Sequence, residues 1–133
     1  MLPPSGRLGS GNMELTPVGS GGRQVIERYS AVGFRVSGVV YAGPVLVLPE
    51  TTVLWEEAAA TIQSLAPVIA HGGVEILLLG VGLRMTAFPA ALRQSLKASG
   101  IALEVMDTGA ACRTFNLLIG ESRRVAAALL PPA

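Results

Sequence analysis

The chain has 133 residues, half of them hydrophobic and only 14% charged, with a formal net charge of +1 at pH 7. This length favours one domain, and so small a net charge excludes the basic stripe that a nucleic-acid partner requires. No apolar stretch approaches the roughly 18–20 residues of a membrane-spanning helix, so we expect no integral membrane segment.

Residues 1–22 are predicted to be a flexible lead rich in glycine, serine and proline. Such a segment buries too little apolar surface to offset the entropy of ordering it. Its first residues, Met1–Gly6, lack the basic and apolar regions of a secretory signal. We therefore expect a cytoplasmic location in a prokaryote, with any membrane association arising through partners. Residues 23–133 are predicted to form a single domain.

The first part of this domain is typical of a meander of short antiparallel strands. Apolar runs rich in β-branched and aromatic residues occur at 34–36, 39–41 and 45–48. Turn signals separate them, at Ser37-Gly38 and at Ala42-Gly43-Pro44. We expect these three runs to form one antiparallel layer.

After residue 50 the pattern alternates between helices and strands. Nearly unbroken apolar runs predict strands at 74–79 and 101–106, covered on both faces. Apolar residues at three- and four-residue steps predict helices within residues 51–71, 88–99, 108–119 and 121–130. Strands joined by a helix form parallel pairs. The fold class is therefore α/β, with a mixed central sheet, a β-meander layer and helices packed on the sheet.

The candidate ligand cleft lies where the two predicted parallel strands end, after Leu79 and Met106. Ligands bind at the carboxyl ends of parallel strands, where helix N-termini present free N–H groups. The residues that would line this cleft are Gly80, Gly82, Arg84, Thr108, Cys112 and Asn116. The glycines equally suit a tight exit from a strand, and Thr108 equally suits a helix cap.

Cys112 and His71 are the only cysteine and histidine of the chain, which excludes an intrachain disulfide and a Cys/His metal cluster. A thiol in the first turn of a helix, beside Arg113, has the setting of a reactive cysteine. A nucleophile also needs a base, however, and His71 is expected at the opposite edge of the sheet. We interpret Cys112 as a small buried residue and His71 as a helix cap, and we expect no catalytic residue, metal or cofactor.

An ordered series of segments resembles a known family. The segments are Phe34–Gly43, Val45–Pro49, Trp55, Glu75–Gly82, Val105–Thr108, Ala111–Leu118, Glu121, Arg123 and Val125–Leu129. Over about residues 24–132, they are similar to the small α/β domain family of unknown molecular function that includes mitochondrial respiratory complex I assembly factor 3 and the adipogenesis-associated domain protein. The resemblance implies a mixed sheet with a smaller β layer, and it brings no established catalytic residue or cofactor.

Two functions follow from these observations. The resemblance implies a non-catalytic protein-interaction module, with protein clients, that assists assembly of a membrane or respiratory complex such as complex I. A weakly charged, apolar chain suits such a docking role. The alternative is a small-molecule or anion-binding protein, or an enzyme, that uses the cleft after Leu79 and Met106. The client is left open, as is the formation of a homo-oligomer.

Overall fold

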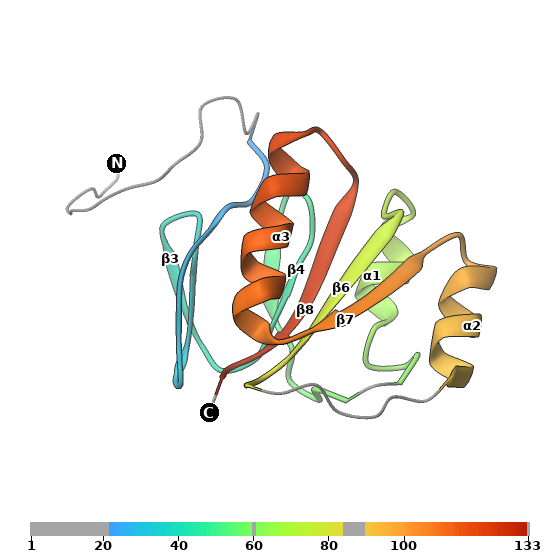
Figure 1. The fold of residues 1–133 in the computed structure, drawn as a ribbon, viewed down its shortest axis with the longest axis horizontal. Helices are drawn as coiled ribbons and strands as arrows, with labels where there is room; N and C mark the ends of the chain where they lie inside the picture. Colours follow the sequence, from blue (N-terminus) through green and yellow to red (C-terminus); the bar gives the residue numbers. More distant parts are fainter. Residues whose placement is uncertain (1–21, 60, 84–89, 133) are drawn as a thin grey trace.

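A three-stranded meander opens the part of the chain that the computed structural model describes, which is residues 22–59, 61–83 and 90–132 (Figure 1). Its strands are antiparallel neighbours in the order β1 (Ile26–Ser30), β2 (Gly33–Val36) and β3 (Val39–Ala42). The meander expected from the sequence is confirmed for the runs at 34–36 and 39–41. The prediction for residues 1–22 falls, apart from Gly22, outside the described residues.

The second sheet has five strands in the order β5-β4-β8-β6-β7. Its strands are β4 (Val45–Val47), β5 (Thr52–Leu54), β6 (Ile76–Val81), β7 (Ala102–Met106) and β8 (Val125–Leu130). β6 is parallel to both β7 and β8, whereas β4 is antiparallel to β5 and β8. The predicted mixed sheet is confirmed. The run at 45–48, which we expected in the meander, instead contributes β4 to this sheet.

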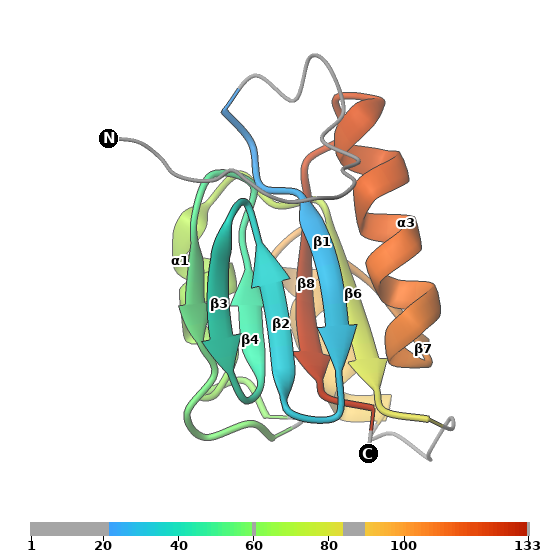
Figure 2. The same ribbon diagram turned by 90° about the vertical axis from the view of Figure 1, so that its left-hand side faces the viewer.

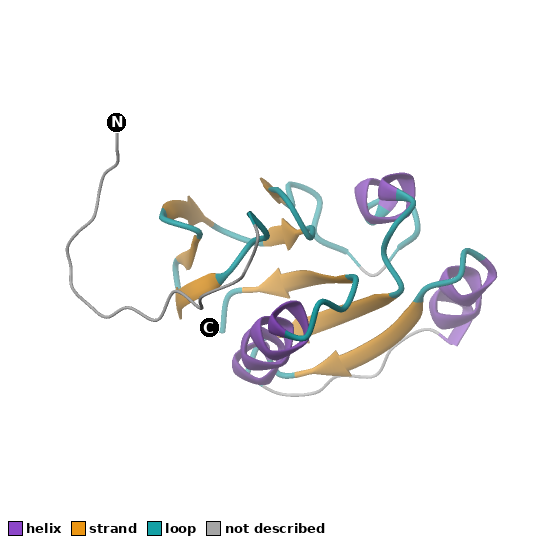
Figure 3. Cartoon of the chain, turned by 90° about the horizontal axis from the view of Figure 1, so that it is seen from above, coloured by secondary structure: helices purple, strands orange, loops and turns teal. Residues whose placement is uncertain are grey.

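Both faces of the central sheet are covered, which explains the apolar character of its strands. The meander and α3 (Thr108–Gly120) lie side by side on one face (Figure 2). The opposite face carries α1 (Ala66–His71) and α2 (Ala90–Ala98) (Figure 3). Successive residues of β6 serve the two layers, because Leu77 packs with α1 and α2 while Leu78 packs with α3. In the described part of the chain, no helix is long and apolar enough to cross a membrane.

The helix expected at 121–130 is wrong, since residues 125–130 form the central strand β8. Alanine favours helices, but β8 lies between β4 and β6 and is buried on both faces, and tertiary context overrides such a propensity. The chain leaves α3 through Ser122, which has a φ of 62°, and the Arg123 N–H donates to the Leu118 carbonyl. This left-handed turn redirects the backbone into the sheet.

The helix expected within residues 51–71 is also largely wrong. Residues 52–54 form β5, and the only helix of the described residues in this stretch is α1, at 66–71. Pro67 lies at its start, where a missing N–H costs nothing, and a proline further inside a helix would break it. The proline therefore marks where this helix begins rather than where a longer helix bends.

Candidate functional site

Three segments are tied together at the end of the parallel strands by the side chain of Thr108. Its hydroxyl accepts a hydrogen bond from the Gly82 N–H (2.9 Å) and donates one to the Leu130 carbonyl (2.6 Å). The Thr108 N–H also donates to the Gly82 carbonyl (2.9 Å). Thr108 is fully buried. Its hydroxyl thus links the ends of β6 and β8 to the start of α3, and it faces neighbours within the protein.

Gly80 lies in the same region, at the closest approach between β6 and α3. A β-carbon added there would lie 2.9 Å from Leu129 Cδ2, 3.1 Å from Thr108 Cα and 3.2 Å from the Ala111 side chain. Such distances leave no room for a side chain. Gly80 therefore serves the close packing of helix on sheet.

The helix cap at this point is Asp107, whereas the sequence suggested Thr108. Asp107 has extended backbone angles, and its Oδ1 accepts a hydrogen bond from the Ala110 N–H (2.9 Å). A carboxylate in this position also stabilises the positive end of the helix dipole. Thr108 is the first residue inside the helix, so its hydroxyl is free to bind the strands.

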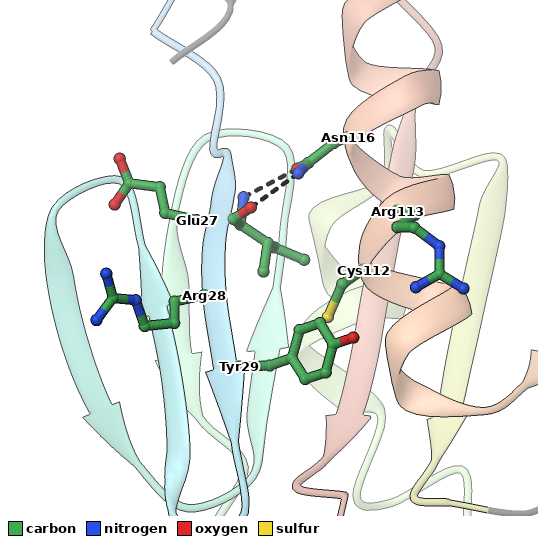
Figure 4. Close-up of a pocket in the computed structure, with 7 residues that line it drawn as sticks. Glu27, Arg28, Tyr29, Cys112, Arg113 and Asn116 are labelled. Atoms are coloured by element: carbon green, nitrogen blue, oxygen red, sulfur yellow. Dashed lines mark hydrogen bonds between the residues drawn. The ribbon is translucent and has the colours of Figure 1, made fainter. Parts of the chain in front are cut away.

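Asn116 lies two turns further along α3 and faces β1. Its Oδ1 accepts from the Ile26 N–H (2.9 Å), and its Nδ2 donates to the Ile26 carbonyl (2.8 Å) (Figure 4). The carboxamide thereby imitates a neighbouring strand and satisfies both backbone groups of Ile26. Asn116 thus links α3 to the edge strand of the meander by two hydrogen bonds.

A shallow hollow of about 340 Å³ lies between β1 and α3. Its lining residues are Ile26, Glu27, Arg28, Tyr29, Cys112, Arg113 and Asn116. Tyr29, which the sequence did not single out, places its hydroxyl against Gly109, where a β-carbon would lie only 2.8 Å away. The charged groups do not converge on one point, because Arg28 and Arg113 extend to opposite sides (Figure 4).

Cys112 forms part of the floor of this hollow and is only 3% exposed. Burial raises the pKa of its thiol to about 12 from an ordinary value of 9.0, and the Arg113 charge offsets only part of that rise. The thiol is consequently protonated at neutral pH. This is the opposite of what an activated nucleophile requires.

Labelling of Cys112 in the native protein is expected to be very slow. With a pKa near 12, the thiolate fraction at pH 8 is about a thousandfold smaller than for a thiol with the ordinary pKa, and burial slows attack further. The measurement is the rate of reaction with a chromogenic disulfide at pH 8, for native protein and for protein unfolded in urea. Native labelling within tenfold of the unfolded rate would contradict this.

His71 lies at the far end of α1, away from Cys112. The helix is capped by Gly72, whose φ is 79°, and the Gly73 N–H donates to His71 Nδ1 (3.0 Å). In the neutral ring Nε2 then carries the proton, and it faces Glu50 Oε1 at 2.9 Å. His71 thus closes the end of the helix, in keeping with its interpretation as a capping residue.

A second hollow, of about 480 Å³, lies beside β7 and α2 and includes Glu75 and Arg93. A hydrogen bond from the Arg124 N–H holds the pKa of the Glu75 carboxyl below its ordinary value, and the Arg123 side chain lowers this pKa further. The Arg93 guanidinium donates to the Leu103 carbonyl on the open side of β7. Both charged groups therefore serve the local structure of this edge.

The candidate cleft divides into two groups. Gly80, Gly82 and Thr108 form the buried junction of β6, β8 and α3, whereas Cys112 and Asn116 face β1. Arg84 lies outside the described residues. Among the residues that the structure describes, no group of three or more His, Cys, Asp or Glu is placed to hold a metal ion. Of the described members of the set, Cys112 and Asn116 line the hollow between β1 and α3 together.

Comparison with known proteins extends these observations. Residues 26–130 match the family described as "Protein of unknown function (DUF498/DUF598)". Over 112 residues the chain is 40% identical to NADH dehydrogenase (ubiquinone) 1 alpha subcomplex assembly factor 3 of Danio rerio, a match covering 81% of this chain and 64% of that protein. The chain thus spans less than two thirds of the length of this curated relative.

Bacterial proteins are similar over more of their own length. An uncharacterized protein of Rhodobacter capsulatus is 36% identical over 115 residues, covering 85% of this chain and 89% of that protein. A crystal structure described as an outer membrane protein from Bartonella henselae superimposes with a TM-score of 0.76 at 33% identity, covering 83% of this chain and 96% of that one. The α/β architecture is therefore shared with solved structures.

Proposed function

The chain belongs to the DUF498/DUF598 family, and from that premise we propose that it is a protein-interaction module that assists assembly of a respiratory NADH dehydrogenase complex. The observation that carries the proposal is the 40% identity to an assembly factor over 81% of this chain. The match is long enough to include most of both sheets and α3. In this proposal the client is a subunit of the complex, bound through the protein surface.

The surface chemistry supports this proposal. Large hydrophobic side chains are exposed in the described part of the chain at Tyr29, Val32, Val39, Val40, Val53, Leu54, Leu83 and Leu117. Four of these eight lie on the neighbouring strands β3 and β5. Apolar side chains that gather in one region suit contact with another protein. The junction at Thr108 supports a catalytic or ligand-binding role less well, because its polar groups are satisfied internally.

Deletion of the gene in its native host is expected to lower the amount of assembled NADH dehydrogenase several-fold, because subunits that lack their assembly partner accumulate unassembled. The measurement is NADH-dependent quinone reduction by isolated membranes, together with native gel electrophoresis of the complex. The wild-type chain supplied on a plasmid should restore both.

Succinate-dependent quinone reduction in the same membranes provides the control, and it should not change. A tagged chain should also retain at least one NADH dehydrogenase subunit through purification. Normal levels of assembled complex in the deletion strain would overturn the proposal.

A further inference from the structure

Two sheet edges lie on the same side of the molecule, away from α3. β3 is the outer strand of the meander, and β5 is an outer strand of the central sheet (Figure 2). The Tyr41 hydroxyl lies 3.5 Å from the Thr52 carbonyl, to which it donates, so the two strands are close neighbours. We call β3 and β5 together the open edge.

The turn before β3 shows which of its backbone groups point outward. Ser37 and Gly38 have φ values of 47° and 84°, as in a two-residue hairpin turn, so the flanking Val36 and Val39 form a hydrogen-bonded pair. Such pairs alternate along an antiparallel ladder. The Gly43 N–H donates to the Val32 carbonyl (3.0 Å), where the alternation predicts another hydrogen-bonded pair.

The residues between these hydrogen-bonded pairs are Val40 and Ala42, and their N–H and C=O groups therefore point away from β2. Neither residue makes a hydrogen bond on this side to the described part of the chain. Backbone groups that point outward in this way form a template for another strand.

The same reasoning applies to β5. The Leu48 N–H donates to the Thr51 carbonyl (2.7 Å), and the Trp55 N–H donates to the Pro44 carbonyl (2.8 Å). By alternation, the backbone groups of Leu54 point away from β4. Within the part of the chain that the structure describes, the open edge therefore presents unpaired backbone groups from both sheets.

At the other two edges, side chains bind some of the outward backbone groups. At β1, the Asn116 carboxamide binds both backbone groups of Ile26. At β7, the Arg93 guanidinium binds the outward carbonyl of Leu103, and Glu104 adds an exposed charge. Charged side chains and covered backbone groups are the usual protection against strand addition. No residue of β3 is charged, and no bulge interrupts its pairing with β2.

Four aliphatic side chains of the open edge are exposed. Val40 is 74% exposed and Val39 51%, and Val53 and Leu54 are also exposed. A strand that adds here gains both main-chain hydrogen bonds and apolar contacts at alternate residues. A segment with aliphatic side chains at alternate positions matches this chemistry.

The positive charge on the solvent face of the meander sets a second requirement for the bound segment. Val40 lies in the same cross-strand row as Arg35 and Arg28, on the solvent face of the meander. Arg35 is paired with Glu27 at 3.1 Å, whereas Arg28 has no ion pair among the described residues. The row therefore carries a surplus of positive charge. An acidic residue on the solvent face of the added strand complements it.

We infer that β3 binds an extended segment of a client protein as an added strand, with aliphatic side chains at alternate positions and an acidic residue on its solvent face. This inference rests on the proposed function, since the client is the NADH dehydrogenase subunit that the chain retains.

The test is the substitution Val40→Pro in the full chain, with Val40→Thr as the matched control. Proline removes the Val40 N–H, which points away from β2, and proline is tolerated on edge strands, so the β2–β3 ladder is kept. Threonine keeps this N–H and the β-branched shape. Far-UV circular dichroism and the melting temperature of both variants establish that they fold.

The measured quantity is the dissociation constant for the retained subunit. Val40→Pro is expected to weaken binding about tenfold, which corresponds to one lost main-chain hydrogen bond, whereas Val40→Thr should stay within about twofold. In the wild-type complex, the amides of Val40 and Ala42 should exchange hydrogen more slowly than in the free chain.

Three results would overturn the inference. If a folded Val40→Pro variant binds the subunit as tightly as wild type, strand addition at β3 fails while the proposed function stands. If the chain retains no NADH dehydrogenase subunit, the proposed function fails, and this inference fails with it. If the free chain doubles its mass with concentration and Val40→Pro abolishes the doubling, the occupant is a second copy rather than a client.

Discussion

Replacing Phe115 by alanine is expected to lower the free energy of unfolding by about 3–5 kcal/mol. Phe115 is fully buried on the inner face of α3, in the cluster that also contains Val36 of the meander and Leu78 of the central sheet. Removing the ring leaves a cavity where α3, the meander and the central sheet meet. Domains of this size are stable by about 5–15 kcal/mol, so a large part of the stability would be lost.

The measurement for Phe115→Ala is urea unfolding followed by the fluorescence of Trp55, the only tryptophan of the chain, which is 3% exposed. The control is Leu117→Ala on the same helix. Leu117 is 61% exposed, so its truncation should change the free energy of unfolding by less than about 0.5 kcal/mol. Equal effects of the two substitutions would contradict the described orientation of α3.

Replacing Thr108 by valine is expected to cost about 2–4 kcal/mol of unfolding free energy. Valine has nearly the shape of threonine, but it removes the acceptor for the Gly82 N–H and the donor to the Leu130 carbonyl. Both backbone groups would then lack a partner at the junction of β6, β8 and α3. The expected effect comes from these two unsatisfied groups rather than from packing.

Thr108→Ser is the matched control, because serine keeps the hydroxyl and loses one methyl group. Its expected cost is about 0.5–1.5 kcal/mol, as for the loss of a buried methyl group elsewhere. Hydrogen exchange provides a local readout, since the Gly82 amide should exchange faster in Thr108→Val than in Thr108→Ser. If both variants are equally stable and equally protected at Gly82, the hydroxyl does not tie these segments together.

The two parallel strands could be predicted from the sequence because their pattern has one interpretation. Both are short, nearly continuous apolar runs, and glycine lies close to the ends of the runs. β8 has no such signal, since its alanines suit a helix as well as a strand. Its conformation depends on β4 and β6, which are distant in sequence and pair with it on either side.

In the candidate site, too, some features follow from the sequence and others depend on contacts between distant segments. The sequence placed Gly80, Gly82 and Thr108 together, because strand ends and helix starts meet at one edge of a parallel sheet. It did not indicate that these groups bind one another, which depends on contacts of about 3 Å between β6, β8 and α3. Nor did it indicate the partner of Asn116, because Ile26 lies 90 positions earlier in the chain.

The sequence by itself therefore determined the α/β class, the short strands of the meander, the parallel pair and the family resemblance, all of which depend on local patterns and their order. Only the tertiary structure decided that Thr108 is satisfied internally, that Asn116 binds the edge of β1 and that β3 is an outer strand with no hydrogen-bonded neighbour beyond β2 among the described residues. These features arise from distances between segments far apart in the chain. Local propensity carries no information about such distances.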